Sequence, residues 1–446
     1  MSAPRAAAGA AIAIPTGANA LPAHRITELD SGLRIATEAM PSVRSAALGF
    51  FVNAGSRGET VPEAGLSHFL EHLLFRGTDR YGSAEIDQLF DSMGAELNAG
   101  TDKESTTVYA RMLDQHMPRA FEVIADMVWR PAFREVDPER EVVLEEIAMY
   151  EDDPQDTVFD VLGEAVFGGH PLGRPIIGRA PVIRDTPVET IAAFHAARYV
   201  PLSVVIAAAG SVDHDQIVEL AERTLGGAAV DVFPEIEPAP ADPAATVRFQ
   251  RKDTEQCHVC LGAIGLPRGD DRRFASRVLD AIFGGLSSSR LFQAVREERG
   301  LAYSVYSFAG QYADTGQIGL YVGTRPDKVG DALDVVGEEL GRLREQPATE
   351  EELVRARENV KARVVLALES TGARMNRLGA SLMFGLPLLE TDEVIARFEA
   401  VTLDDLRELT DELWAPERLS AAGIGPDEAA FRAAAAEVTP AGEVAA

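Results

Sequence analysis

The chain has 446 residues, of which 46% are hydrophobic and 25% are charged, a composition typical of folded globular proteins and not of disordered or fibrous ones. The length excludes a single small module and suggests two or more domains. The net charge of −29 argues against binding to nucleic acid or anionic lipid. No segment has the roughly 18 consecutive apolar residues that a membrane-spanning helix needs, so no membrane partner is expected.

Two features of the sequence bear on the cellular location. Residues 1–24 are rich in weakly hydrophobic Ala and Gly, and Arg5 is their only charged residue before His24. This pattern fits neither a signal peptide nor an Arg-rich transit peptide, so we interpret it as a flexible leader. The only cysteines are Cys257 and Cys260, which excludes a disulfide framework and favours a reducing, cytoplasmic location.

Strand-like and helix-like segments alternate along the chain, which favours mixed α and β layers. In the first half a buried strand is expected over 46–54, helices over 65–76 and 85–92, and strand-like segments over 96–113. A longer helix is expected over 137–151, because Asp137 is a suitable N-cap and Pro138 is favoured in the first turn.

The two halves of the chain resemble each other. In the first half, Tyr199 is followed two residues later by Pro and then, nine residues further, by Gly210. The same spacing recurs in the second half from Trp414 to Gly425, and each motif follows a helical pattern that begins with Thr. A duplicated unit of about 200 residues is the simplest interpretation.

The expected fold is therefore α+β, with two duplicated domains that are each a mixed β-sheet flanked by helices. We assign the N-terminal domain to 25–228 and the C-terminal domain to 246–432. A linker rich in Pro and Ala over 229–245 joins them, and an Ala-rich tail over 433–446 follows.

The segment from Ser67 to Phe75 carries a candidate metal site. His68 and His72 are four residues apart, so on a helix both imidazoles project from one face and can bind one metal ion. Glu71 shares that face and can reach a metal-bound water without being a ligand. The alternative is a chance cluster of two core or surface histidines near a glutamate. That alternative is disfavoured because burying three polar groups without partners is costly.

A hydrolytic zinc site normally has three protein ligands, so a third ligand is expected outside this segment. The helix over 137–151 offers the best candidates, since Glu139 and Glu146 share one of its faces whereas Glu145 points elsewhere. For most acidic residues of this helix a solvated surface position is the alternative.

This combination of motifs resembles the inverted-zincin peptidases, the pitrilysin and insulinase (M16) family, and most closely their bacterial and mitochondrial processing-peptidase branch. The family pattern is His-x-x-Glu-His, then a Glu about 75 residues later with another Glu seven residues before it. Here Glu146 lies 74 positions after His72, and Glu139 precedes Glu146 by seven. The resemblance implies one zinc ion per chain, bound by His68, His72 and Glu146, with Glu139 supporting a histidine. Glu145 remains the alternative third ligand.

Two further stretches match the same family. Asn98 and Ala99 lie in a segment that resembles the edge strand on which the family binds an extended peptide. Arg296 and Tyr303, seven residues apart, follow a Gly- and Ser-rich segment that resembles the family's substrate clamp. Their guanidinium and hydroxyl groups suit a peptide carbonyl or its oxyanion. The segment lacks the Gly-Lys-Ser/Thr ending of a phosphate loop, so a nucleotide site is rejected.

The function that the resemblance implies is that of a zinc metalloendopeptidase for unfolded or extended peptides and presequence-like segments. A zinc-bound water would be the nucleophile, and Glu71 the general base. A homodimer is expected because the chain carries both the metal half and the clamp half, and the net charge of −29 favours basic peptides. The alternative is a non-catalytic scaffold or a partner subunit of a processing-peptidase-like complex.

Overall fold

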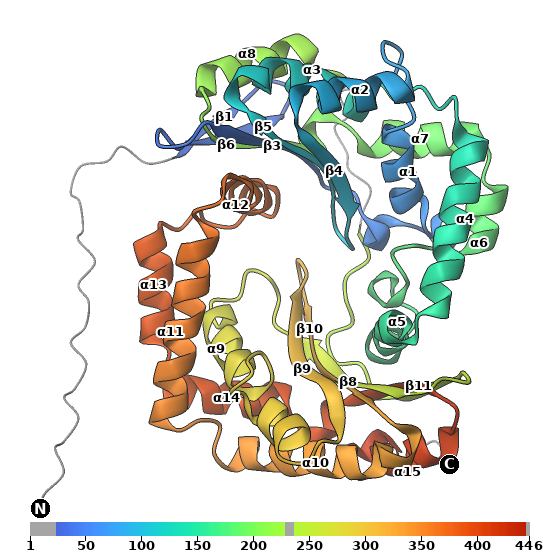
Figure 1. The fold of residues 1–446 in the computed structure, drawn as a ribbon, viewed down its shortest axis with the longest axis vertical. Helices are drawn as coiled ribbons and strands as arrows, with labels where there is room; N and C mark the ends of the chain where they lie inside the picture. The colour runs from blue at the N-terminus through green and yellow to red at the C-terminus, as the bar shows by residue number, and fades with distance from the viewer. Residues whose placement is uncertain (1–23, 228–235, 443–446) are drawn as a thin grey trace, which may run out of the picture.

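The computed structural model describes residues 24–227 and 236–442, which form two mixed β-sheets, each flanked by helices (Figure 1). The strands of the first sheet are β1 His24–Glu28, β2 Arg34–Ala39, β3 Ser45–Val52, β4 Glu96–Thr101, β5 Thr106–Leu113 and β6 Val204–Gly210. The strands of the second sheet are β7 Val247–Arg251, β8 Cys257–Gly265, β9 Ala302–Gln311, β10 Gly316–Thr324 and β11 Ser420–Gly425.

The helices follow the same division of the chain. Those of the first half are α1 Leu66–Leu74, α2 Ser83–Met93, α3 Met117–Trp129, α4 Val136–Asp152, α5 Pro154–Phe167, α6 Ala180–Asp185, α7 Val188–Arg198 and α8 His214–Thr224. Those of the second half are α9 Arg273–Phe283, α10 Val329–Glu345, α11 Glu350–Ala367, α12 Thr371–Met383, α13 Thr391–Ala400, α14 Leu403–Leu413 and α15 Glu428–Ala436.

The strand order confirms the duplication that the Tyr199 and Trp414 motifs predict. The first sheet has the order β1-β2-β6-β3-β5-β4, and the second has the order β7-β11-β8-β10-β9. In each sheet one pair is parallel, β2 with β6 and β11 with β7, and the other pairs are antiparallel. Apart from the additional strand β1, the two sheets therefore have the same topology.

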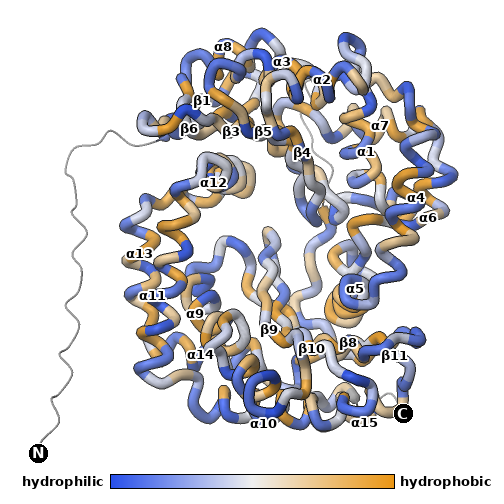
Figure 2. Tube along the Cα trace, in the orientation of Figure 1, coloured by the Kyte–Doolittle hydropathy of each residue, from blue (hydrophilic) through white to orange (hydrophobic). Residues whose placement is uncertain are grey.

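Each half contributes one helix to the other half's sheet. Helix α12, from the second half, packs on β2, β3 and β6 of the first sheet, where Leu378 and Met375 are buried with Phe51 (Figure 1). Helix α5, from the first half, packs on β8 and β11, where Leu162 is buried with Tyr321. Figure 2 shows hydrophobic residues along α5 interspersed with hydrophilic ones. Because apolar burial holds both helices in place, the two halves are interlocked and not merely joined by a linker.

An ionic network, buried at Arg57 and Glu104 and exposed at Asp314, also joins the halves. Arg57 of the first half contacts Glu104 at 2.8 Å and Asp314 of the second half at 2.7 Å. Arg268 of the second half contacts Glu104 at 2.7 Å. Since Glu104 follows β4 and Asp314 lies between β9 and β10, the network fixes the second sheet beside the end of β4.

The predicted elements of the first half are confirmed, with boundaries shifted by at most two residues. One detail is wrong: α4 begins at Val136 with Glu135 as its N-cap, so Asp137 lies inside the first turn. The tail expected from 433 is packed on the second half as far as residue 439, because α15 continues to Ala436 and both Val438 and Thr439 are buried.

Some expectations concern residues that the structure does not describe. Residues 1–23 of the expected leader, residue 228 with the first part of the expected linker (229–235), and residues 443–446 lie outside the described ranges. The last residue of the expected leader, His24, is the first residue of β1. The rest of the expected linker, 236–245, contains neither helix nor strand. None of the helices in the described ranges is both long and apolar enough to cross a bilayer.

Candidate metal centre

Helix α1 is anchored at its N-terminus by a buried carboxylate. Glu59 accepts hydrogen bonds of 2.7 Å from the backbone N–H groups of both Gly65 and Ser67. Burial raises the pKa of Glu59 to about 7, and the two backbone hydrogen bonds oppose that rise. Gly65 has φ of 102°, and a Cβ there would lie 2.7 Å from the Cα of Gly178, so only glycine allows this close approach.

The apolar face of α1 fixes the direction of its polar face. Phe69, Leu70, Leu73 and Leu74 are fully buried in the core of the first half. The other side of the helix packs against α4 and β4. The HxxEH segment therefore presents its polar side chains to these two elements, as the four-residue spacing predicts.

Three side chains from α1 and α4 converge at one point. One ligand atom each from His68, His72 and Glu146 lies within 4.8 Å of the others. The Nε2 atom of His68 is 3.7 Å from Glu146 Oε1, and the Nε2 atom of His72 is 3.3 Å from Glu146 Oε2. Burial, together with the neighbouring His72, lowers the pKa of His68 to about 4. A neutral imidazole is the form that binds a metal ion.

Glu139 holds His72 from the side opposite the cluster. Its Oε1 atom lies 2.8 Å from Nδ1 of His72, and its other oxygen pairs with Arg76. The carboxylate is buried, with 3% of its surface exposed. A carboxylate on Nδ1 fixes the tautomer that leaves Nε2 free for a metal. Glu145, the alternative third ligand, is exposed and is not part of the cluster.

Glu71 lies between the cluster and the edge of the sheet. Its Oε2 atom accepts a hydrogen bond of 2.7 Å from the hydroxyl of Thr101, the last residue of β4. Burial raises the pKa of Glu71, and the hydrogen bond from Thr101 opposes this rise. A raised pKa is typical of a carboxyl group that acts as a proton acceptor near neutral pH.

Strand β4, which carries Asn98 and Ala99, is an edge strand. It pairs with β5 and has no strand on its other side among the described residues. Asn98 is exposed, Ala99 is partly buried, and the Asn98 Oδ1 atom accepts the Ala99 N–H at 2.8 Å. An open edge offers backbone groups to which an extended peptide can add as a further strand.

Arg296 and Tyr303 contact each other but do not join the cluster. Arg296 lies in a π-helical turn, Phe292–Glu297, and stacks on the Tyr303 ring at 4.5 Å. Its guanidinium also donates to the Tyr303 carbonyl at 3.1 Å. Tyr303 is 75% exposed. Figure 1 shows α1 and α4 in the upper half of the molecule and β9, which contains Tyr303, in the lower half.

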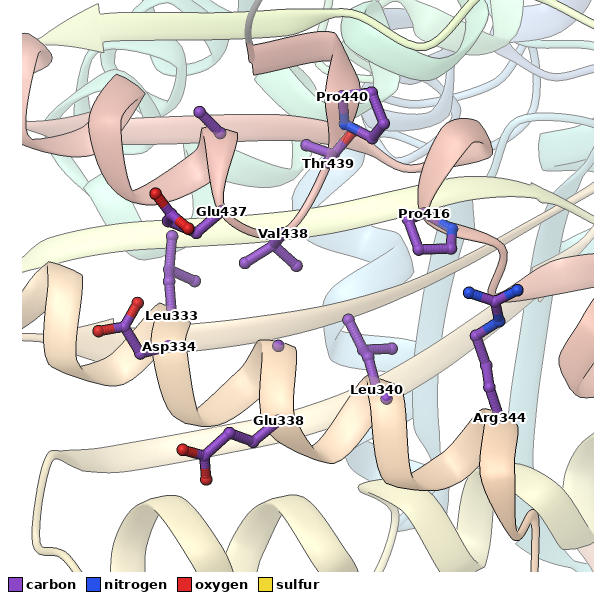
Figure 3. Close-up of a pocket in the computed structure, with 13 residues that line it drawn as sticks. Leu333, Asp334, Glu338, Leu340, Arg344, Pro416, Glu437, Val438, Thr439 and Pro440 are labelled. Atoms are coloured by element: carbon purple, nitrogen blue, oxygen red, sulfur yellow. The ribbon is translucent and has the colours of Figure 1, made fainter.

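A cavity of about 430 Å³ opens beside the cluster. His68 and Glu146 form part of its wall, and neither Arg296 nor Tyr303 lines it. A larger cavity of about 680 Å³ lies between α10 and the residues after α15, where Leu333, Leu340 and Val438 line it (Figure 3). No histidine lines that second cavity, so the candidate metal centre is associated with the first cavity.

Three residues of the site were missed by sequence reasoning. Sequence patterns for helix caps consider only the residues directly next to a helix. Glu59 caps α1 from a loop six residues before Gly65, so no such pattern predicts it. The polar contacts of Thr101 and Arg76 depend on how β4 and α4 lie against α1. Of these three residues, only Thr101 could have been recognised from the sequence, because it ends the segment that resembles the family's edge strand.

Comparison with known families gives two matches along the chain. A model described as "Insulinase (Peptidase family M16)" matches residues 34–180, which include the cluster. A model described as "Peptidase M16 inactive domain" matches residues 187–360. The second match begins within the first half, since it includes α7, β6 and α8, and it ends in α11 of the second half.

Similar proteins occur in several bacteria. A Streptomyces coelicolor protein named as an uncharacterized zinc protease is 43% identical, covering 90% of this chain and 89% of its own. A Bacillus subtilis protein named in the same way is 38% identical over 86% of this chain and 94% of its own. A crystal structure of a protease from Helicobacter pylori has a TM-score of 0.87 at 22% identity, covering 91% of this chain and all of the other.

Proposed function

Since this chain belongs to the peptidase M16 (insulinase) family, we propose that it is a zinc metalloendopeptidase that cleaves unfolded or extended peptides. The observation that carries the proposal is the convergence of His68, His72 and Glu146, with Glu71 beside them. The names of the relatives support both protease activity and zinc.

The cluster fits a zinc ion. Two imidazoles and one carboxylate are a ligand set of catalytic zinc sites, which keep the fourth position open. Ligand atoms around zinc at bond lengths of about 2.0–2.1 Å are separated by little more than 3 Å, and the Nε2–oxygen distances here are 3.3 and 3.7 Å. The Nδ1 atom of His72 is occupied by Glu139, so Nε2 is the atom available for the metal.

Zinc bound there would supply a Lewis acid that polarises the peptide carbonyl and lowers the pKa of water. Glu71 is not needed as a ligand, so its carboxylate can accept a proton from the attacking water and deliver it to the leaving amine. Thr101 holds this carboxylate at the end of β4. The peptide would lie along β4 beside Asn98 and Ala99, which brings its scissile bond to the same end.

Arg296 and Tyr303 suit a carbonyl or oxyanion, but within one chain they do not line the cavity beside His68. The interlocked helices α5 and α12 oppose a large movement of one half against the other. We therefore propose a homodimer in which Arg296 and Tyr303 act on the metal centre of the second copy. The net charge of −29 supports attraction of basic peptides, and the two buried, free cysteines are compatible with the cytoplasm.

The test is cleavage of a quenched, unstructured peptide of about 20 residues by the zinc-loaded protein, long enough to extend along an edge strand. The wild type should cleave it, and Glu71→Gln should bind zinc but lose at least about a hundredfold in kcat, as expected for loss of a general base. Equal turnover by both proteins would contradict the mechanism. Zinc binding without turnover by the wild type would favour the scaffold role.

A further inference from the structure

The two histidines of the cluster are held in different ways. The Nδ1 atom of His72 has the Glu139 carboxylate as its partner at 2.8 Å. The Nδ1 atom of His68 is buried and has no hydrogen-bond partner among the described residues. A polar side chain from α4 therefore orients the His72 ring, whereas the direction of the His68 ring depends on the part of the backbone that carries it.

That part of the backbone is the first turn of α1. Helix α1 has nine residues, and His68 is the third of them. The first N–H groups of a helix have no partner within the helix. The first α-helical hydrogen bond of α1 runs from the Phe69 N–H to the Gly65 carbonyl, and Gly65, as the N-cap, has no side chain that could cap the turn. The turn that carries His68 therefore needs a hydrogen-bond acceptor from outside the helix.

Glu59 supplies this acceptor with both of its oxygens. Its Oε2 atom accepts the N–H of Gly65 and its Oε1 atom accepts the N–H of Ser67, the residue directly before His68, each at 2.7 Å. A negative charge at this end also interacts favourably with the partial positive charge of a helix N-terminus. Because the side chain is only 4% exposed, water has little access to take its place.

Glu59 is itself held by residues outside α1. Arg174 donates a hydrogen bond of 2.9 Å to the backbone carbonyl of Glu59, and Arg198 donates one of 3.0 Å to that of Gly58. Both arginines lie in the segment between α5 and β6. The position of the carboxylate is therefore fixed independently of the helix that it caps.

We propose that Glu59 is a positioning residue of the metal centre, which holds the first turn of α1, and with it His68, in the place that zinc binding requires. His72 does not depend on it, because Glu139 holds that ring directly. Each histidine thus has its own carboxylate, one that acts through the backbone and one that acts on the ring. The inference rests on the proposed function, because it concerns the same zinc site.

The test is the zinc affinity at pH 8, measured by competition with chromophoric chelators, in the wild type and in variants that lack one histidine. Glu59→Gln keeps the size of the side chain but loses the charged acceptor of two N–H groups, so it should weaken zinc binding at least about tenfold. This loss should persist when His72→Ala is also present and should fall below about twofold when His68→Ala is present. Glu139→Gln should show the reverse pattern, since non-additivity identifies residues that act together.

Two further variants keep the result interpretable. Glu63→Gln is the matched control and should leave the affinity unchanged, because Glu63 lies in the same loop but accepts its backbone hydrogen bond, of 3.0 Å, from Thr60 and not from α1. Arg174→Met removes the hydrogen bond to the Glu59 carbonyl and leaves the carboxylate in the chain. It should give the pattern of Glu59→Gln with a smaller loss, and it decides the matter if Glu59→Gln does not fold.

Zinc binding requires no turnover, so the failure of this inference and the failure of the proposed function can be distinguished. A wild type that does not bind zinc would refute the proposed function and this inference with it. A wild type that binds zinc, with equal losses from Glu59→Gln in both histidine backgrounds, would show a general effect on stability and overturn the positioning role alone. Unchanged affinity in Glu59→Gln would overturn it as well.

Discussion

The hydroxyl of Thr101 donates a hydrogen bond of 2.7 Å to Glu71, and this contact joins the HxxEH helix to the last residue of the edge strand β4. The residue proposed as general base is thereby fixed relative to the strand proposed to bind the peptide. Positioning of this kind matters because proton transfer requires the base within hydrogen-bond reach of the reacting group.

Replacement of Thr101 by Val should reduce kcat by about tenfold or more and change KM little, because the hydrogen bond from the hydroxyl to the carboxylate of the base, worth about 1.5 kcal/mol or more, is lost. Thr101→Ser keeps the hydroxyl and should restore turnover. Steady-state kinetics on the same quenched peptide give kcat and KM for both variants. A rise in KM with unchanged kcat would indicate instead that Thr101 only shapes the peptide site.

The zinc affinity should separate ligands from supporting residues. Glu146→Gln removes a ligand charge and should weaken zinc binding more than Glu139→Gln, which disturbs only the orientation of His72 and should weaken it about 10- to 100-fold. Glu145→Gln is the matched control, since this exposed neighbour should leave the affinity unchanged. Competition with a chromophoric chelator gives the three values. A large loss in Glu145→Gln alone would instead identify Glu145 as the ligand.

Local patterns predicted much of the fold and the site. The spacing of His68 and His72, and of Glu139 and Glu146, is a property of single helices, so periodicity alone brings each pair to one face. The duplication was equally visible, because Tyr199 and Trp414 begin equivalent turns before β6 and β11. Such patterns depend on neighbours in sequence and need no knowledge of tertiary contacts.

The exchange of helices between the halves was not predicted. Helix α12 has an apolar face that would suit either sheet, and nothing in its sequence specifies that Leu378 packs with Phe51 of the other half. The contact of Arg57 with Asp314 likewise joins residues 257 positions apart. These contacts depend on how two complete sheets lie against each other, which periodicity does not encode.

The exchange makes the stability of the first sheet depend on the second half. Leu378→Ala leaves a cavity between α12 and the first sheet and should lower the free energy of unfolding by about 2–5 kcal/mol. Because the halves are interlocked, tryptophan fluorescence from Trp129 in the first half and Trp414 in the second should shift together in a urea titration. Variants that each retain one tryptophan would distinguish the two signals, and a shift confined to Trp414 would contradict the interlocked arrangement.

Acid should weaken the second half through Glu352. Burial alone would raise the pKa of this carboxyl. Two hydrogen bonds of 2.8 Å from Arg290, the hydrogen bond from the Thr349 N–H and the Arg290 charge together outweigh burial and lower the pKa from 4.5 to about 2. A lowered pKa in the folded state stabilises the protein above pH 4.5, and this contribution is lost as the pH falls towards 2.

Glu352→Gln should therefore reduce the free energy of unfolding by about 2 kcal/mol at pH 7, and the difference from the wild type should shrink below pH 4.5. Urea titrations between pH 7 and pH 3 measure this difference in the free energy of unfolding. Glu351→Gln is the control, because its carboxylate is exposed and its nearest cation lies 3.9 Å away. A difference that stays constant with pH would show that the lost contacts are not ionic.

The homodimer can be tested by mixing two inactive variants. Glu71→Gln lacks the proposed base, and Arg296→Ala lacks the proposed clamp, so each homodimer should be inactive. If the clamp acts on the second copy, a mixed dimer contains one site with both an intact Glu71 and an intact Arg296. Random exchange of equal amounts should then restore about a quarter of the wild-type activity, since half of the dimers are mixed and one of their two sites is complete.

If Arg296 instead served the metal centre of its own chain, every site would lack one residue and mixing would restore nothing. Tyr303→Phe in place of Arg296→Ala should give the same complementation. Native mass spectrometry of a mixture in which one variant carries an affinity tag establishes exchange between dimers, because a mixed dimer has an intermediate mass.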